Sequence, residues 1–73
     1  MARKRYEVVP AAGDWVVKHL GAVLSRHSLK SSAVDAGVRV ARANEPSQLV
    51  IHLQNGQFEE ERTYGDDPFP PRG

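Results

Sequence analysis

The feature that most constrains the fold is a single stretch with helical spacing, set between two groups of strand-like segments. From Ser31 to Asn44, apolar residues recur with the period of an α-helix. The segments on either side have the β-branched, aromatic or alternating composition of strands: residues 5–9, 15–19, 22–27, 48–54 and 57–63. One amphipathic helix covers one face of a sheet. The pattern therefore predicts an α+β fold, a small antiparallel sheet of four or five strands in two hairpins with the helix packed on one face.

Local signals indicate where this helix ends and how it packs. Asn44 followed by Pro46 predicts the stop. The start is expected to be capped by one of three serines: Ser28, Ser31 or Ser32. Gly37 inside the helix costs about 1 kcal/mol relative to alanine, so it predicts a close approach of helix and sheet. Trp15, the only tryptophan, is expected in the core beneath the helix.

The segment from Gln48 to Thr63 carries the strongest turn signal of the chain. Asn55-Gly56 predicts a two-residue type I′ turn. That turn sets four cross-strand pairs: Leu53 with Phe58, His52 with Glu59, Ile51 with Glu60, and Val50 with Glu61. The returning strand is charged on both faces, which is typical of an edge strand that must not pair with other chains.

Composition and motifs argue against catalysis. Cysteine is absent, and no nucleophile motif, phosphate loop or dinucleotide fingerprint is present. His19 and His27 have no acidic residue at ligand spacing, so no metal site is expected. His52 opposite Glu59 could form a catalytic pair, but such cross-strand neighbours are ordinary sheet stabilisers, and the structural interpretation is favoured. A chain of 73 residues forms one domain with little room for a deep pocket. We expect no enzyme activity, no cofactor and no small-molecule substrate.

Charge is distributed unevenly along the chain. Residues 1–30 contain six Lys/Arg and two acidic residues, whereas residues 31–73 contain four and seven. The basic candidates for phosphate contacts are Arg3, Lys4, Arg5, Lys18, Arg26 and Lys30. A pI near 8.2 is lower than that of a dedicated nucleic-acid binder. No signal peptide or membrane-spanning stretch is recognised, so we expect a soluble cytoplasmic protein.

Four runs form a combination more specific than any one of them: Tyr6 to Pro10, Trp15 to Lys18, Ala33 to Arg42, and Tyr64 to Pro68. The combination resembles the small bacterial and phage family catalogued as domain of unknown function 2188. The resemblance covers residues 6–73 and implies an architecture but no established activity. Two positions depart from the family pattern, since Ala11 replaces a frequent histidine and Leu29 replaces the threonine before Lys30. A fainter similarity, over residues 13–42, is to the arm-site DNA-binding domains of tyrosine integrases, which present a three-stranded sheet to a DNA groove.

We therefore predict a basic arm (1–5), a single α+β domain (6–63) and a proline-rich tail (64–73). The leading hypothesis is a non-catalytic accessory domain that associates with DNA or RNA through the arm and the first hairpin. The alternative is an adaptor or homodimer that binds protein. It would use the sheet face left bare by the helix, around Val9, Val16 and Val50, or the tail residues Tyr64, Phe69, Pro70 and Pro71.

Overall fold

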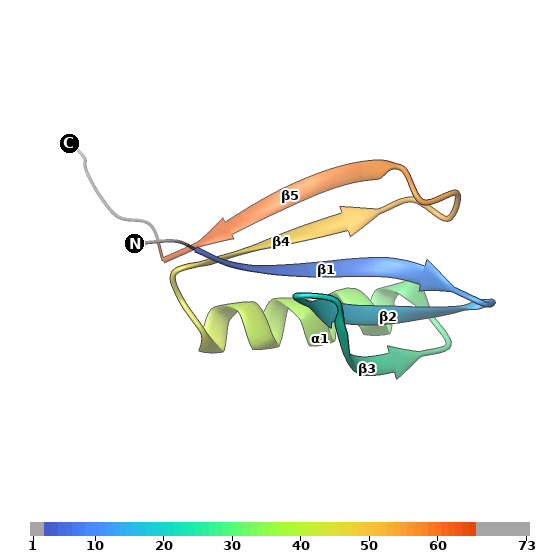
Figure 1. The fold of residues 1–73 in the computed structure, drawn as a ribbon, viewed down its shortest axis with the longest axis horizontal. Coiled ribbons are helices and arrows are strands. Elements are labelled where there is room, and N and C mark those ends of the chain that lie inside the picture. Colours follow the sequence, from blue (N-terminus) through green and yellow to red (C-terminus); the bar gives the residue numbers. More distant parts are fainter. Residues whose placement is uncertain (1–2, 66–73) are drawn as a thin grey trace.

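The computed structural model describes residues 3–65, which form one helix and one five-stranded sheet (Figure 1). The elements in chain order are β1 (Lys4–Ala11), β2 (Asp14–His19), β3 (Ala22–His27), α1 (Lys30–Ala43), β4 (Ser47–His52) and β5 (Phe58–Tyr64). The strands lie in the order β3-β2-β1-β4-β5, with α1 against one face. The predicted α+β class and both predicted hairpins are confirmed. The predicted arm and tail overlap the sheet, because β1 already begins at Lys4 and β5 includes Tyr64.

The sheet is mixed, so the prediction of a wholly antiparallel sheet is wrong in one place. β1 and β4 pair in parallel, whereas every other neighbouring pair is antiparallel. The physical reason is the helix. α1 carries the chain from the end of β3 back along the sheet, so that β4 starts beside the start of β1, as a helical crossover between parallel strands requires. This connection leaves β3 and β5 as the two edges.

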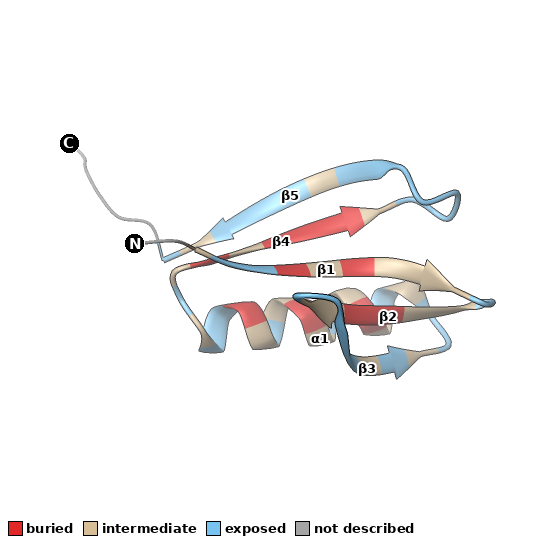
Figure 2. Ribbon diagram, viewed as in Figure 1, coloured by how far each residue is buried: buried red, intermediate tan, exposed pale blue. Residues whose placement is uncertain are grey.

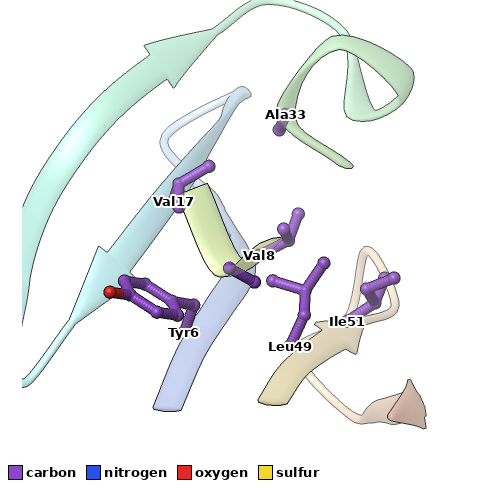
Figure 3. Packing of buried hydrophobic residues seen from close by; sticks show 7 residues of the cluster. Tyr6, Val8, Val17, Ala33, Leu49 and Ile51 are labelled. Carbon is purple, nitrogen blue, oxygen red and sulfur yellow. The ribbon is translucent and has the colours of Figure 1, made fainter. Parts of the chain in front are cut away.

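The core lies between α1 and the three central strands. Val8 of β1 and Leu49 of β4 are fully buried side by side, with Tyr6 and Val17 on one side and Ile51 on the other (Figure 3). Gly37 faces these residues, since a Cβ added there would lie 2.9 Å from Leu49 Cδ1 and 3.1 Å from Val8 Cγ2. The predicted close approach is confirmed. Trp15 also packs against this core, but it remains half-buried.

The ends of α1 agree with the sequence prediction at the stop but not at the start. At the stop, Asn44 Nδ2 donates a hydrogen bond to Val40 O at 2.8 Å. The buried Ser47 Oγ donates to Ala41 O at 2.5 Å. The start has Leu29 as N-cap and no side-chain cap, so the expected serine cap is wrong. The leucine side chain has no oxygen to accept a hydrogen bond from the first-turn N–H groups.

The turns also differ from expectation. Ala12-Gly13 and Leu20-Gly21 have positive φ at both residues, which makes them the two type I′ turns. At Asn55-Gly56 only Gly56 has positive φ. There Gly56 N–H donates to Leu53 O at 2.8 Å, and Leu53 N–H donates to Gln57 O at 2.7 Å. The loop thus has three residues, a turn followed by a glycine bulge, and the predicted two-residue turn is wrong.

A second irregularity in this hairpin restores the predicted register further along. Glu59 is an extra residue in β5, so His52 lies opposite Phe58, while Ile51 lies opposite Glu60 and Val50 opposite Glu61. The predicted pairs of Ile51 and Val50 are confirmed. Those of Leu53 and His52 are wrong, because each bulge shifts one strand past the other by one residue.

The sheet face opposite α1 has no helix or strand over it within residues 3–65, yet it is not a bare apolar surface. Val16 and Val50 both lie on this face and are each 2% exposed. Their neighbours on the same face include the long side chains of Glu7, Lys18 and Arg26. The aliphatic stems of such residues can cover apolar atoms. The expectation of a bare apolar face therefore does not hold.

Candidate functional site

One edge of the sheet, which we call the β3 edge (residues 20–27), exposes several apolar side chains. It comprises β3 and the turn before it. Val23 is 54% and Leu24 is 48% exposed, although both belong to a strand. A β-bulge leaves Leu24 without a partner in β2. Among the described residues no strand pairs with the outer side of β3, so backbone N–H and C=O groups face outward there.

The turn at the start of this edge holds an exposed and strained leucine. Leu20 is 88% exposed and has φ of 53°. A non-glycine residue in the left-handed region costs about 1–2 kcal/mol, and type I′ turns favour asparagine, aspartate or glycine there. Because its side chain is exposed, Leu20 gains no stability from burial that would offset this cost. Ala12 holds the equivalent turn position with φ of 51°, so what distinguishes Leu20 is its large exposed apolar side chain.

The opposite edge is built differently, and we call it the β5 edge (residues 58–64). Its middle carries Glu59, Glu60, Glu61 and Arg62 in succession. Glu59 forms an ion pair with Lys30 of α1. Glu60 accepts a hydrogen bond from Arg62 Nε at 2.6 Å, which raises the pKa of that guanidinium above its ordinary value. Phe58 is exposed at the start of β5, directly before these charges. Neither edge strand contains a buried residue (Figure 2).

The six basic residues singled out by the sequence do not form one patch. Arg3 donates to Ser47 O at 3.3 Å and to Tyr64 O at 3.1 Å, so it ties β1 to the ends of β4 and β5. Lys4 lies inside β1. Lys30 pairs with Glu59 and lies 5.2 Å from the centre of the Trp15 ring.

Only Arg5, Lys18 and Arg26 share a surface, the face opposite α1. Carboxylates lie among them. Arg5 pairs with Glu7 and Arg26 with Asp14, each at 3.2 Å, and Lys18 lies across from Glu7. The positive charge of this surface is thus partly neutralised within the domain.

Of the predicted partner-binding residues, Tyr64 is described and packs on the domain. It is half-buried against the core, and the Arg42 guanidinium lies 5.3 Å from its ring centre. The other three, Phe69, Pro70 and Pro71, lie outside the described residues. Tyr64 therefore packs the end of β5 against the end of α1.

The histidines lie apart and are bound locally. His19 Nδ1 lies 2.9 Å from Arg5 O and its ring stacks on Tyr6, while His27 Nε2 lies 2.9 Å from Ser25 Oγ. His52 Nδ1 donates to Gly56 O at 3.1 Å. Within residues 3–65, no three His, Asp or Glu side chains lie close enough together to hold a metal ion.

A shallow hollow of about 320 Å³ lies between the tips of the two hairpins. It is lined by residues 10–15 and Gln54, and Asp14 is the only acidic or basic residue in its wall. The Asp14 carboxylate is paired with Arg26. The hollow thus offers no free acid, base or nucleophile.

The sequence predicted residues 22–27 as a strand and singled out Arg26 within it as a phosphate contact, but no role was assigned to its apolar residues. The sequence did contain signals of an exposed apolar strand. Val23 and Leu24 are adjacent apolar residues, which cannot both face the core of a strand with alternating sides. Leu20-Gly21 is a turn with a leucine where a polar residue is usual. What could not be read from the sequence was that β3 lies at an edge.

Comparison with known proteins gives a family and no further relative. Neither the curated proteins nor the solved structures provide a match. Within the described residues, no helix has the length and apolar character needed to cross a membrane. The family model described as "Uncharacterized protein conserved in bacteria (DUF2188)" matches residues 6–64, which span β1 to β5. The chain therefore belongs to the DUF2188 family of uncharacterized bacterial proteins.

Proposed function

We propose that this domain is a non-catalytic protein-binding module that takes an extended segment of its partner as a sixth strand beside β3. The observation that carries the proposal is the contrast between the two sheet edges. Both edges have unpaired backbone groups. β5 carries charged residues that discourage pairing, directly after the exposed Phe58, whereas β3 exposes Val23 and Leu24 with Arg26 as its one charged residue. Strand addition uses such an edge, with backbone hydrogen bonds for affinity and side-chain contacts for specificity.

The β3 edge has the components that strand addition needs. Six residues of β3 offer a length typical of a β-strand. Val23 and Leu24 supply apolar contacts for an incoming strand. Leu20 extends that apolar surface beyond the start of β3. Burial of the exposed parts of these side chains is favourable by about 25 cal/mol per Å² of apolar area removed from water.

The absence of usable chemical groups supports a non-catalytic role. General acid–base catalysis needs a titratable group within reach of a bound substrate. The hollow lined by residues 10–15 and Gln54 contains Asp14, whose carboxylate is already paired with Arg26. The three histidines lie on different strands and have backbone, Ser or aromatic neighbours.

Site-specific photocrosslinking in the native host tests the proposal. A photoreactive amino acid replaces Val23 at the β3 edge or Thr63 at the β5 edge, as a matched control on an exposed strand. We expect a discrete adduct from position 23, sensitive to protease and resistant to nuclease, that Leu24→Lys abolishes. An adduct that forms equally from both positions, or one that survives Leu24→Lys, would contradict strand addition at β3. An adduct made only of this chain would identify a second copy as the partner.

One observation favours association with nucleic acid as a second candidate. Arg5, Lys18 and Arg26 lie on the same sheet face, which is the surface that a three-stranded sheet would present to DNA or RNA. The test is a mobility-shift assay at about 50 mM salt with Arg5→Ala, Lys18→Ala and Arg26→Ala combined. Arg3 is left intact because it bonds Ser47 and Tyr64. A shift that the triple variant abolishes would favour nucleic acid over protein.

A further inference from the structure

The charges around the β3 edge indicate what kind of segment would pair there. This inference rests on the proposed function. From Trp15 to Val34 the chain contains no acidic residue, but it includes Lys18, Arg26 and Lys30 together with His19 and His27. β3, the start of α1 and all of β2 except its first residue, Asp14, belong to this acid-free stretch. The β5 edge at the other side of the sheet carries three glutamates in succession. The open edge is thus apolar and bordered by basic residues, of which Arg26 pairs with Asp14 and Lys30 with Glu59.

Arg26 provides the contact point for an incoming carboxylate. Within residues 3–65 its hydrogen bonds run through Nη1, to Ala11 O at 3.3 Å and to Asp14 Oδ2 at 3.2 Å. A guanidinium has five N–H donors, so several remain for a ligand. Arg26 and Val23 lie on the same face of β3, because their partners Val16 and Lys18 lie on one face of β2. A sixth strand would place its own side chains beside both.

We infer that the partner segment is an acidic, extended peptide, with a carboxylate beside Arg26 and an apolar side chain beside Val23. Opposite charges on neighbouring strands stabilise a pair, whereas like charges destabilise it. A second copy of this chain fits poorly, because β3 against β3 would bring two acid-free, basic stretches together. A phosphate backbone fits poorly too, since it would leave Val23 and Leu24 uncovered and offers no strand to pair with the backbone.

A peptide selection tests this inference with the intact domain. A displayed library of random 12-residue peptides is panned against the immobilised protein, with the Leu24→Lys variant used for counter-selection. Selected peptides are then synthesised and titrated into isotope-labelled domain, and shifted amide resonances map the contact. We expect peptides with net negative charge and β-branched or aromatic residues, with shifts concentrated in β2 and β3.

Charge variants measure the contribution of the basic edge. Lys18→Gln with Arg26→Gln should weaken the binding of a selected peptide by about tenfold, as loss of complementary charge does at interfaces. Arg39→Gln, on the exposed side of α1, is the matched control and should leave the affinity unchanged. A rise in salt from about 50 to 500 mM should weaken binding of the parent and have less effect on the double variant.

The outcomes separate the two proposals. Peptides that bind at β3 but are neutral or basic would overturn the acidic partner and leave strand addition standing. Failure to enrich any peptide over the Leu24→Lys variant, or shifts confined to other elements, would overturn both. An oligonucleotide that shifts the β3 resonances when no selected peptide does would likewise overturn both and favour nucleic acid.

Discussion

The two edges of one sheet have opposite character. The β5 edge places Glu59, Glu60 and Glu61 in a row, with Lys30 and Arg62 as ionic partners. The β3 edge has a single charged residue in its strand, Arg26, and exposes Val23 and Leu24. An unpaired strand invites other chains, and charge is a common defence against it. A domain that defends one edge and leaves the other open has an edge available for binding.

The difference between the edges is local, because both depend on the same core. The central strands β1 and β4 supply Val8, Leu49 and Ile51, which pack under α1. Neither edge strand contributes a fully buried side chain. Residues of the edges can therefore change pairing behaviour without a large change in the stability of the fold. The predictions below test this separation, from the largest expected effect to the smallest.

Removal of the β5 charges should make the two edges alike. Replacement of Glu59, Glu60 and Glu61 by threonine leaves a strand with high β-propensity and little charge. We expect self-association at least about tenfold tighter than in the parent, or about 1.4 kcal/mol. Sedimentation velocity over a range of concentrations measures it. Asp35→Thr removes an exposed acid of α1, away from β5, and should not associate. Equal sedimentation of the parent and the triple variant would show that these charges are not a defence.

Gly37→Ala should lower the stability of both edges together. The added Cβ would meet Leu49 Cδ1 at 2.9 Å and Val8 Cγ2 at 3.1 Å, and both side chains are fully buried. Overpacking costs about 1–3 kcal/mol, and better helix propensity returns about 1 kcal/mol. A net loss of up to about 2 kcal/mol is expected in denaturant unfolding. Hydrogen exchange should accelerate in β3 and β5 alike. Arg39→Ala, at an exposed position of the same helix, serves as control. Faster exchange at one edge only would contradict the shared core.

Relief of turn strain should separate stability from binding. Ala12 and Leu20 hold equivalent positions in the two type I′ turns, with φ of 51° and 53°. Asparagine tolerates this conformation, so Ala12→Asn and Leu20→Asn should each stabilise by about 0.5–1 kcal/mol. Thermal unfolding should show a rise of about 2–8 °C for each. Only Leu20→Asn should lower the crosslinking yield at position 23. Equal crosslinking yields from both variants would show that Leu20 is not part of the proposed binding edge.

Loss of single ion pairs should change stability least. Glu59→Gln breaks the pair with Lys30, and Asp14→Asn breaks the pair with Arg26. The four side chains are between 32% and 52% exposed. Each change should therefore lower the free energy of unfolding by less than about 1 kcal/mol, and this loss should be smaller at high salt. Chemical denaturation at two salt concentrations measures both. A much larger loss for one variant would mean that the two edges differ in stability as well as in pairing behaviour.

Much of the fold could be predicted because its signals are local. The helical spacing from Ser31 to Asn44 located α1 to within a residue at each end. The five strand-like segments became five strands, and Gly37 marked the close helix–sheet contact. The misses came from residues whose geometry depends on neighbours. Asn55-Gly56 suited a two-residue turn, but hydrogen bonds from Leu53 and Gly56 closed a three-residue loop.

The candidate site was less accessible to sequence reasoning. The basic residues were identified from the sequence, but their distribution over the surface could not be predicted. That distribution depends on strand order and on contacts such as that of Arg3 with Tyr64. The prediction of a bare face around Val16 and Val50 did not anticipate the long side chains on the same face. Residues 22–27 were predicted as a strand that contains the candidate Arg26, but no role was assigned to Val23 and Leu24.

The sequence by itself determined the elements and their inner faces, because helical and strand periodicities are properties of consecutive residues. It also determined that residues 59–61 would resist pairing, since three adjacent glutamates are charged in any arrangement. The tertiary structure alone decided that β4 lies in parallel beside β1 and that β3 ends the sheet. Strand order depends on where the α1 crossover returns the chain, and that depends on contacts between residues far apart in sequence. The open edge at β3 follows from that strand order.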